Sequence, residues 1–371
     1  MFRQIIYILC LVVFVACSKK ESDRTIPVSN DYAQGYAVEK FDEYTVVEVR
    51  NPWDTLKILQ RYILVPKSVD LCDEMPEGIV VRTPVASAAV YASLHCGMIK
   101  ELGKSEIITG ICDVHYNADS ELKRRVEEGE VADLGSSFLP DVEKIISIAP
   151  EVIIVSPYKD KGEDKVSRLG IPVIEMADYM ESVPLARTEW IKFLSMLFEC
   201  ETVADSLFNE TVTQYNALIE RVRDVKHRPT LFCELKTGGV WYQPGGESYM
   251  AQLYRDAGID YLWSDNSDKG SISLSFEEVF ARGADADLWI MKYADEQDKT
   301  LESLKTEYPP YENFNSYKAE NVWGVNALKV PFYEDMPLYP QYVLRDLMLI
   351  AHPEIFTASD TTRYFKKLKD E

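Results

Sequence analysis

Apolar positions in this chain fall into short continuous runs that alternate with longer amphipathic stretches. Residues 107–111, 152–155 and 287–291 are mostly apolar and lack the alternation of a half-exposed strand. Residues 87–102 carry an apolar side chain at every fourth position, which indicates a helix. Continuous apolar strands between helices are typical of a parallel sheet with both faces covered. The pattern therefore predicts an α/β fold from residue 78 onward.

The alternation of strands and helices occurs twice along the chain, which predicts two lobes. Residues 78–184 form the predicted N-terminal lobe, and residues 228–371 form the predicted C-terminal lobe. Residues 185–227 contain no proline or glycine and carry apolar side chains at helical spacing. They predict one connecting helix of about 35–40 residues, which would span on the order of 55 Å. Such a helix is long enough to bridge two lobes.

The N-terminal part of the chain predicts an additional β element. Residues 44–50 and 61–65 are rich in β-branched and aromatic side chains, and an Asn-Pro turn signal lies at residues 51–54. These features predict a β-hairpin extension over residues 41–77. We expect residues 17–40 to form a polar tether that leads into it.

The first residues predict export and a lipid anchor. Arg3 precedes an apolar run over residues 5–16, which is too short to cross a membrane and has the length of a signal peptide. The run ends Phe14-Val15-Ala16-Cys17, which resembles a bacterial lipobox. We therefore expect a signal peptide over residues 1–16, cleavage before Cys17 and a lipid on its sulfur. A plain secretory peptide is the alternative. The expected location is the cell envelope, on the periplasmic side or at the cell surface.

The amino-acid composition argues against one class of binding partner. The chain has 371 residues, 40 Lys and Arg against 61 Asp and Glu, and a formal net charge of −21. This balance argues against nucleic acid, because phosphate backbones are bound by clustered cations. After the signal peptide and the lipid site, five cysteines are left, and we expect buried thiols although their pairing stays open. The five are Cys72, Cys96, Cys112, Cys200 and Cys233. We expect a monomer.

Two segments of the chain match each other and carry a family resemblance. Residues 140–155 and 274–290 each place a glutamate in the first turn of a short helix, with a strand about ten residues later. Together with residues 243–246 and 256–259, this arrangement resembles the periplasmic-binding proteins that serve ABC importers of ferric siderophores, haem and vitamin B12. The resemblance implies two Rossmann-like lobes, a long rigid helix that joins them and a ligand cleft between them.

The resemblance also implies a docking role for two glutamates. Glu143 and Glu277 occupy the positions where the family places one glutamate per lobe, each of which docks into an arginine pocket of the permease dimer. Glu278 adjoins Glu277, so either of these two residues could be the docking glutamate of the C-terminal lobe. A purely structural role is the alternative, because a glutamate in the first turn of a helix interacts favourably with the helix dipole.

Loops that follow the predicted strands supply candidate ligand-binding residues, because ligands of open α/β sheets lie beyond the carboxyl ends of the strands. Aromatic side chains there suit a large planar ligand, and cations suit carboxylates or catecholates. The candidates are Arg82, Tyr116, Tyr158, Lys159, Trp241, Tyr242, Lys292 and Tyr333. We expect no intrinsic cofactor; the cargo is an iron chelate (ferric siderophore or haem) or cobalamin. The acidic total favours a neutral or cationic ligand unless the cleft is locally basic.

We therefore interpret the chain as a substrate-binding lipoprotein and not as an enzyme. One alternative is a surface lipoprotein that hands its ligand to an outer-membrane receptor. Another is a periplasmic enzyme such as a chelatase, for which Asp113 and His115 are the only candidate pair. A related branch of the family binds bare zinc or manganese, but only His115 of the four histidines falls in a cleft loop. An axial contact of His115 or a tyrosine with haem iron is left open.

Overall fold

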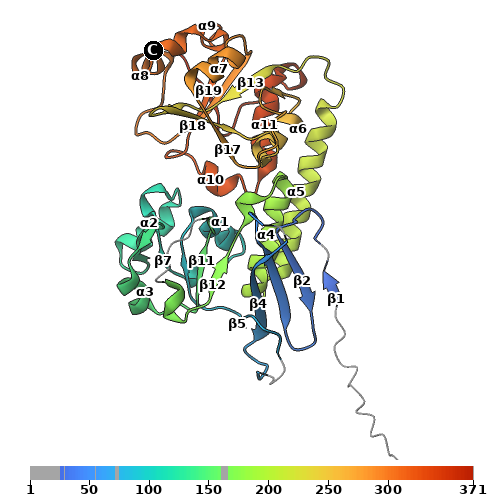
Figure 1. Ribbon diagram of the computed structural model, residues 1–371, viewed down its shortest axis with the longest axis vertical. Coiled ribbons are helices and arrows are strands. Elements are labelled where there is room, and N and C mark those ends of the chain that lie inside the picture. The colour runs from blue at the N-terminus through green and yellow to red at the C-terminus, as the bar shows by residue number, and fades with distance from the viewer. Residues whose placement is uncertain (1–25, 29, 55, 72–74, 160–165, 371) are drawn as a thin grey trace, which may run out of the picture.

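The computed structural model describes residues 26–28, 30–54, 56–71, 75–159 and 166–370. The expected signal peptide, Cys17 and the first part of the expected tether lie outside these residues. Two lobes are stacked along the long axis of the molecule, and a separate sheet lies beside the lower, N-terminal lobe (Figure 1). Within the part of the chain that is described, no helix combines the length and the apolar character needed to cross a membrane.

The N-terminal lobe is built on a five-stranded parallel sheet with the order β12-β11-β6-β7-β8. Its strands are β6 (Ala88–Val90), β7 (Ile108–Ile111), β8 (Ala132–Asp133), β11 (Val152–Val155) and β12 (Val173–Glu175). Its helices are α1 (Ser93–Glu101), α2 (Ser120–Glu127) and α3 (Val142–Ile148), and a short hairpin pairs β9 (Gly135–Ser136) with β10 (Leu139–Pro140). All four residues of β11 are buried, as its continuous apolar pattern predicts.

The C-terminal lobe is also built on a mainly parallel five-stranded sheet, with the strand order β16-β13-β18-β19-β20, in which only β20 is antiparallel. Its strands are β13 (Thr230–Cys233), β16 (Asp260–Tyr261), β18 (Leu288–Tyr293), β19 (Val322–Asn326) and β20 (Lys366–Lys367). A second small sheet contains β14 (Lys236–Thr237), β15 (Val240–Pro244) and β17 (Ser271–Leu274). The helices are α6 (Tyr249–Asp256), α7 (Phe276–Gly283), α8 (Leu301–Glu307), α9 (Asn315–Lys318), α10 (Phe332–Asp335) and α11 (Pro340–Ala351). The predicted α/β architecture with two lobes is confirmed.

The connection between the lobes differs from the single helix that we expected over residues 185–227. It consists of α4 (Pro184–Leu197) and α5 (Glu201–Val222), which pack against each other. The chain turns at Glu199, whose φ of 53° lies in the left-handed region. This turn uses neither glycine nor proline, so the sequence carries no obvious break. Helix α5 alone, about 33 Å long at 1.5 Å per residue, reaches from the lower lobe to α11 of the upper lobe (Figure 1).

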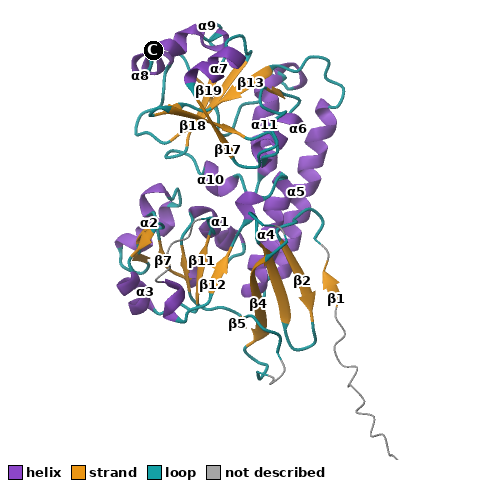
Figure 2. Ribbon diagram, in the orientation of Figure 1, coloured by secondary structure: helices purple, strands orange, loops and turns teal. Residues whose placement is uncertain are grey.

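The N-terminal extension is larger than the expected hairpin. It is a five-stranded sheet in sequential order, composed of β1 (Ile26–Val28), β2 (Tyr36–Lys40), β3 (Thr45–Arg50), β4 (Ile58–Pro66) and β5 (Ile79–Thr83). Strand β5 runs parallel to β4, and the other pairs are antiparallel (Figure 2). Residues 26–28 and 36–40, expected in the tether, are therefore strands. Residues 79–83, expected in the lobe, belong to this sheet, and the lobe sheet starts at β6 within the stretch expected as helix.

Two buried carboxylates hold the start of the extension against the lobe. The carboxylate of Glu189 on α4 accepts hydrogen bonds from the backbone N–H groups of Asp31, Tyr32 and Ala33 at 2.7–2.9 Å. Glu181 accepts the next two N–H groups, those of residues 34 and 35. These bonds satisfy five consecutive backbone donors that no strand or helix satisfies.

A buried tyrosine joins the sheet of the extension to the sheet of the lobe. The Tyr62 hydroxyl donates a hydrogen bond to the Val173 carbonyl at 3.0 Å and accepts one from the Glu175 N–H at 2.7 Å. Both partners lie on β12, the edge strand of the lobe sheet. The Tyr62 ring also packs near Phe193 of α4. The extension thus covers the edge of the lobe sheet and shares its core.

Candidate ligand-binding cleft

Two cavities lie at the carboxyl ends of the two lobe sheets. A cavity of about 790 Å³ in the N-terminal lobe is lined by residues that directly follow β6, β7 and β11. A cavity of about 1120 Å³ in the C-terminal lobe is lined by residues at the ends of β13 and β18. Tyr179 lines both cavities, so they adjoin and form one cleft between the lobes. This is the place where open α/β sheets bind ligands.

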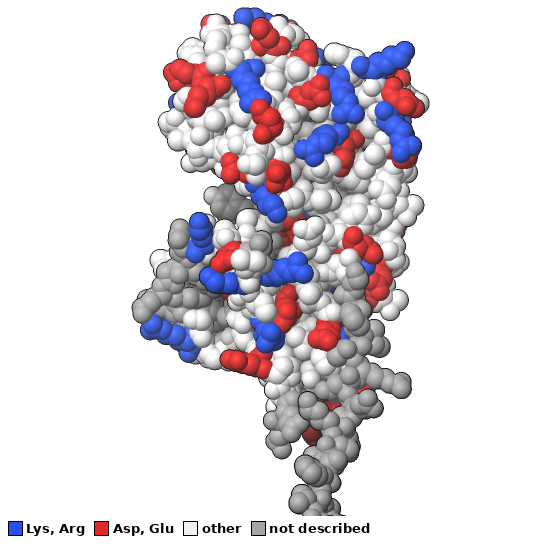
Figure 3. All heavy atoms as spheres, turned by 45° about the vertical axis from the view of Figure 1, so that its right-hand side comes forward, with Lys and Arg blue, Asp and Glu red and all other residues white. Residues whose placement is uncertain are grey.

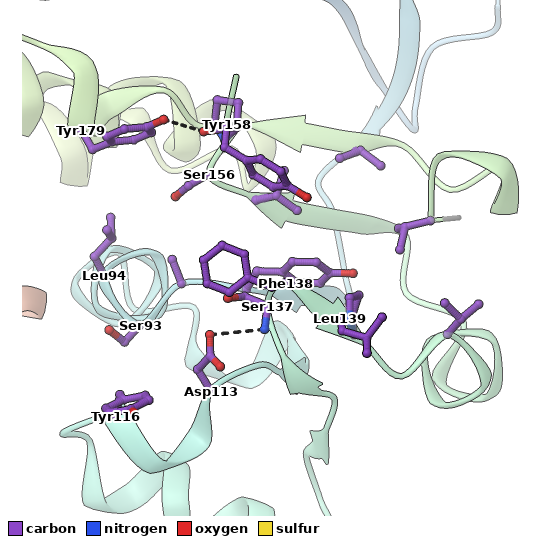
Figure 4. Close-up of a pocket in the computed structure, with 18 residues that line it drawn as sticks. Ser93, Leu94, Asp113, Tyr116, Ser137, Phe138, Leu139, Ser156, Tyr158 and Tyr179 are labelled. Carbon is purple, nitrogen blue, oxygen red and sulfur yellow. Dashed lines mark hydrogen bonds between the residues drawn. The ribbon is translucent and has the colours of Figure 1, made fainter. Parts of the chain in front are cut away.

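The N-terminal wall of the cleft is aromatic and nearly uncharged. Its rings are those of Tyr91, Tyr116, Phe138, Tyr158 and Tyr179. Phe138 is 80% exposed, and its ring centroid lies 6.3 Å from that of Tyr158 (Figure 4). An apolar ligand would bury this ring, which water now surrounds.

Asp113 is the single charged residue on the described N-terminal wall. It lies just beyond β7 with a φ of 52°, and its carboxylate accepts a hydrogen bond from the Ser137 N–H at 3.3 Å (Figure 4). On the opposite side of this cavity, the Tyr179 hydroxyl donates to the Pro157 carbonyl at 2.6 Å. Backbone hydrogen bonds therefore hold polar groups on both sides of the aromatic surface.

The C-terminal wall is charged and rich in tyrosine. Five cations and three carboxylates line it, and the buried carboxylate of Asp178, which pairs with Arg187, leaves an excess of one positive charge. The cations are Arg187, Lys236, Lys269, Lys292 and Lys299, and the carboxylates are Glu234, Asp295 and Glu307. On the face of the upper lobe seen in Figure 3, positive and negative side chains are interspersed. The wall is therefore locally basic although the chain as a whole is acidic.

Three of these cations have carboxylate partners. Lys292 forms an ion pair with Glu234. Burial alone would lower the pKa of Lys292, but the nearby Glu234 carboxylate raises it above its usual value, so the ammonium is held in its charged form. Lys299 lies within 3.1 Å of the carboxylates of Asp295 and Glu307.

Arg187 belongs to a buried network that connects both lobes. Its guanidinium Nε donates to Asp178 at 3.0 Å, and the other carboxylate oxygen of Asp178 lies 3.1 Å from Nε2 of His95. The guanidinium also lies over the ring of Tyr249 on α6, 4.8 Å from its centroid. Because Asp178 is fully buried, these partners compensate the cost of its desolvation.

The structure brings five of the eight predicted ligand residues to the walls of the cleft. Tyr116 and Tyr158 line the N-terminal wall. Tyr242, Lys292 and Tyr333 line the C-terminal wall. Burial raises the pKa of Tyr333, and the nearby Lys292 opposes this shift.

The other three predicted residues are not part of the described walls. Arg82 lies on β5 in the extension, where its guanidinium donates to the carbonyls of three residues in the segment 66–69. Lys159 is exposed and follows Tyr158 outside the cavity lining. Trp241 is fully buried in the core of the C-terminal lobe, where its indole N–H donates to the Cys233 carbonyl at 2.9 Å.

Several residues of the cleft were not predicted from the sequence. Phe138 lies two residues before the segment 140–155 that carries the family resemblance, so its position was a usable signal. Tyr179 lies in a short turn after β12, and Arg187 lies on the connecting helix. Lys236 begins the two-residue strand β14 and Lys269 lies in a loop, and neither segment carries a strong sequence pattern. Only the folded chain places these side chains on one cleft.

The two candidate docking glutamates lie on equivalent short helices of the two lobes. Glu143 is exposed in the first turn of α3, and Glu277 is exposed in the first turn of α7. The neighbouring Glu278 has a structural role, because its carboxylate accepts hydrogen bonds from the backbone N–H and the hydroxyl of Ser275 in a capping box. Glu277 takes no part in this capping box among the described contacts.

Histidine and cysteine side chains are arranged as follows in the described chain. His115 is exposed, packs against the Tyr116 ring and does not line the N-terminal cavity. No group of three or more His, Cys, Asp or Glu side chains there has a geometry that could hold a metal ion. The described cysteines are free thiols, and all but Cys200 are buried. Cys72 lies outside the described residues.

The chain matches a protein-family model and two relatives over most of its length. A family model for periplasmic binding proteins matches residues 89–327. Two uncharacterized lipoproteins of Methanocaldococcus jannaschii are 26% and 24% identical to the chain over 305 and 311 residues. These alignments cover 77% and 79% of this chain, and 70% and 76% of the relatives.

Solved structures show the same fold. A protein of an ABC-type Fe³⁺-hydroxamate transport system from Saccharomonospora viridis has a TM-score of 0.58 at 16% identity, with 72% of this chain and 93% of that one covered. CeuE of Helicobacter pylori with Ni(II) bound has a TM-score of 0.59 at 16% identity and coverages of 76% and 88%. The haem-binding protein RhuT of Roseiflexus has a TM-score of 0.53 at 17% identity and coverages of 71% and 99%. With two lobes, a cleft between them and a family match over most of its length, the chain belongs to the periplasmic binding protein family.

Proposed function

We propose that this protein is the lipid-anchored, ligand-capturing component of an ABC importer for an iron chelate (ferric siderophore or haem) or for cobalamin. The observation that carries the proposal is the pair of adjoining cavities at the carboxyl ends of both lobe sheets. Capture is non-covalent: aromatic rings stack on the ligand, and a few polar groups orient it. The iron, haem and nickel ligands named for similar structures support this class of cargo.

The anchor is proposed at Cys17, where the lipobox-like sequence ends. The names of the two curated relatives, both lipoproteins, support it. Mass spectrometry of the mature protein tests it directly: a diacylglyceryl-modified N-terminal cysteine is expected, and an unmodified residue would contradict it. Replacement of Cys17 by serine should release the protein from the membrane fraction.

Ligand class is tested by calorimetric titration of the chain from Ser18, which retains every described residue. The panel is haemin, cobalamin, a ferric hydroxamate and a ferric catecholate, with zinc and manganese ions as controls. Saturable binding of one chelate at micromolar or lower concentration supports the proposal. Heat is the appropriate signal, because Trp241 lies in the core and not in the cleft. Binding of a bare metal ion alone would contradict the chelate assignment.

Delivery to a permease is tested through the two exposed glutamates. Glu143→Lys combined with Glu277→Lys should abolish cellular uptake of the bound chelate while its affinity stays unchanged, because the charges that set the docking register are reversed. The matched control reverses Glu121 and Glu302, which are also exposed in first turns of helices, one in each lobe. Unchanged uptake in the first variant would favour hand-off to an outer-membrane receptor.

An enzymatic role is the second alternative class. It requires a base or nucleophile in the cleft, and the sequence offers Asp113 with His115. The structure places Asp113 on the wall but His115 outside it. Recovery of chemically unaltered chelate after prolonged incubation supports binding, and metal insertion into a metal-free macrocycle would support the enzyme.

A further inference from the structure

The two walls of the cleft differ in chemistry, and this difference restricts the ligand further. The N-terminal wall offers five aromatic rings and one carboxylate. The C-terminal wall offers five cations against three carboxylates and the buried Asp178, an excess of one positive charge in a chain of net charge −21. A ligand that contacts both walls therefore meets an apolar surface on one side and a basic surface on the other.

Two of the five cations on the C-terminal wall have no carboxylate partner among the described residues. Arg187, Lys292 and Lys299 each have a carboxylate partner. No ion pair joins Lys236 or Lys269 to a carboxylate within the described part of the chain.

The surroundings of Lys236 and Lys269 leave both charges accessible to a ligand. The Lys236 ammonium donates to the Gly238 carbonyl at 2.6 Å and lies 4.8 Å from the centroid of the Tyr308 ring. An ammonium has three donors, so two of those on Lys236 have no protein acceptor in the described structure. Lys269 is exposed and lines the same cavity. Two cations without carboxylate partners on one wall are a suitable site for acid groups.

The geometry points to an amphiphilic ligand with a flat apolar body and acid groups along one edge. The body lies on the N-terminal wall against Phe138 and Tyr158, and the acid edge faces Lys236 and Lys269. This inference rests on the proposed function and names the substrate class of the same cleft. Because the C-terminal wall is locally basic, the cleft can bind an anionic ligand although the chain as a whole is acidic.

The reverse orientation is unfavourable for two physical reasons. It would bring the acid edge toward the Asp113 carboxylate, and like charges in a partly desolvated site repel each other. It would also leave the Phe138 ring, now 80% exposed, against polar groups. A neutral ligand of the same size would leave both lysines without an acid partner. Charge and shape therefore select an acidic chelate over a neutral one.

The test compares haemin, which carries two carboxylates on one edge of a planar macrocycle, with its dimethyl ester, in which both acids are masked. The chain from Ser18 is titrated with each probe in the same mixed solvent that keeps them monomeric. The ester should bind about tenfold more weakly or worse, because hydrogen bonds to charged groups are the stronger class. Since this arm uses the unaltered protein, it does not depend on the folding of a variant.

Variants then locate the two ends of the ligand. Lys236→Gln with Lys269→Gln should weaken haemin binding about tenfold and leave ester binding unchanged. The matched control, Lys318→Gln with Lys367→Gln, removes two exposed lysines of the same lobe outside the cavity and should change neither affinity. Phe138→Ala should weaken both probes by the same factor, because it contacts the apolar body.

The outcomes separate this inference from the proposed function. Equal affinity for haemin and its ester overturns the inference while transport of a chelate still stands. Binding of cobalamin or a neutral ferric hydroxamate in preference to haemin does the same. Failure of every chelate in the panel to bind folded protein overturns both. Loss of haemin binding in the Lys318 and Lys367 control would also overturn it, because net charge and not the cleft would then govern binding.

Discussion

Replacement of Glu189 by glutamine tests how the N-terminal segment is held to the lobe. Glu189 is 1% exposed, and its two carboxylate oxygens accept three consecutive backbone N–H groups at 2.7–2.9 Å. Oε2 accepts two of these bonds, and Oε1 accepts the third, from Asp31. Glutamine preserves the shape of the side chain, so the substitution removes only the negative charge and one hydrogen-bond acceptor.

The expected loss follows from these three bonds. With the amide oxygen in the place of Oε2, two bonds persist as neutral bonds and lose about half of their strength. The amide group at the other position faces the N–H of Asp31 and cannot accept from it. Taking about 1 kcal/mol for each weakened bond and 1–2 kcal/mol for the lost one, we expect destabilisation by about 3 kcal/mol. For unfolding of the described chain as one unit, with about 2.1 cal/mol/K of entropy per residue, this corresponds to a fall in Tm of about 4 °C.

Thermal unfolding followed by circular dichroism measures this loss. Glu210→Gln is the matched control, because Glu210 is exposed on α5 and accepts only from the Gln214 side chain in the described structure. Limited proteolysis should in addition cleave the Glu189 variant near residues 31–35 before the wild type. A fall in Tm no larger than that of the control would refute the reasoning, since water would then satisfy these donors equally well.

Two further stability predictions concern charged side chains. Hydrogen bonds from Asn326 and Lys329 lower the pKa of Asp298 to about 2, so its contribution is present above the ordinary aspartate pKa of about 3.9 and is lost as the pH falls toward 2. The difference in unfolding free energy between wild type and Asp298→Asn should therefore shrink from about pH 5 to pH 2, and a difference independent of pH would contradict this. Lys292→Met leaves the half-buried carboxylate of Glu234 without its partner and should cost about 2–3 kcal/mol in urea unfolding. The double variant with Glu234→Gln should recover part of this loss, and a further loss in the double variant would show that the ion pair is not the reason.

Local sequence signals were sufficient to predict those helices and strands whose start and end depend on their own residues. Helix α3 starts after Asp141, whose side chain accepts from the Lys144 N–H, and the apolar strand β11 follows at the predicted place. The same holds for α6 and α7, which begin at serine caps. Capping residues and continuous apolar runs act over a few positions, so they can be recognised without the fold.

Strand pairing and strand orientation could not be recognised in this way. Arg82 follows an apolar run in the sequence, but its strand pairs with β4 of the extension and not with the lobe sheet. Trp241 and Tyr242 are adjacent on β15, yet one is buried and the other exposed, because successive side chains point to opposite faces. Which face is covered depends on the helices and strands that pack there.

By itself, the sequence determined the α/β class, the division into two lobes and the placement of Glu143 and Glu277 in the first turns of short helices, because these follow from periodicity and local capping. Only the tertiary structure decided the turn at Glu199, the five-stranded extension and the chemistry of the two cleft walls. Each of these depends on contacts between residues far apart in the chain. The basic wall illustrates this: Lys236 and Lys269 lack carboxylate partners among the described residues because the fold pairs the other cations and leaves these two facing the cleft.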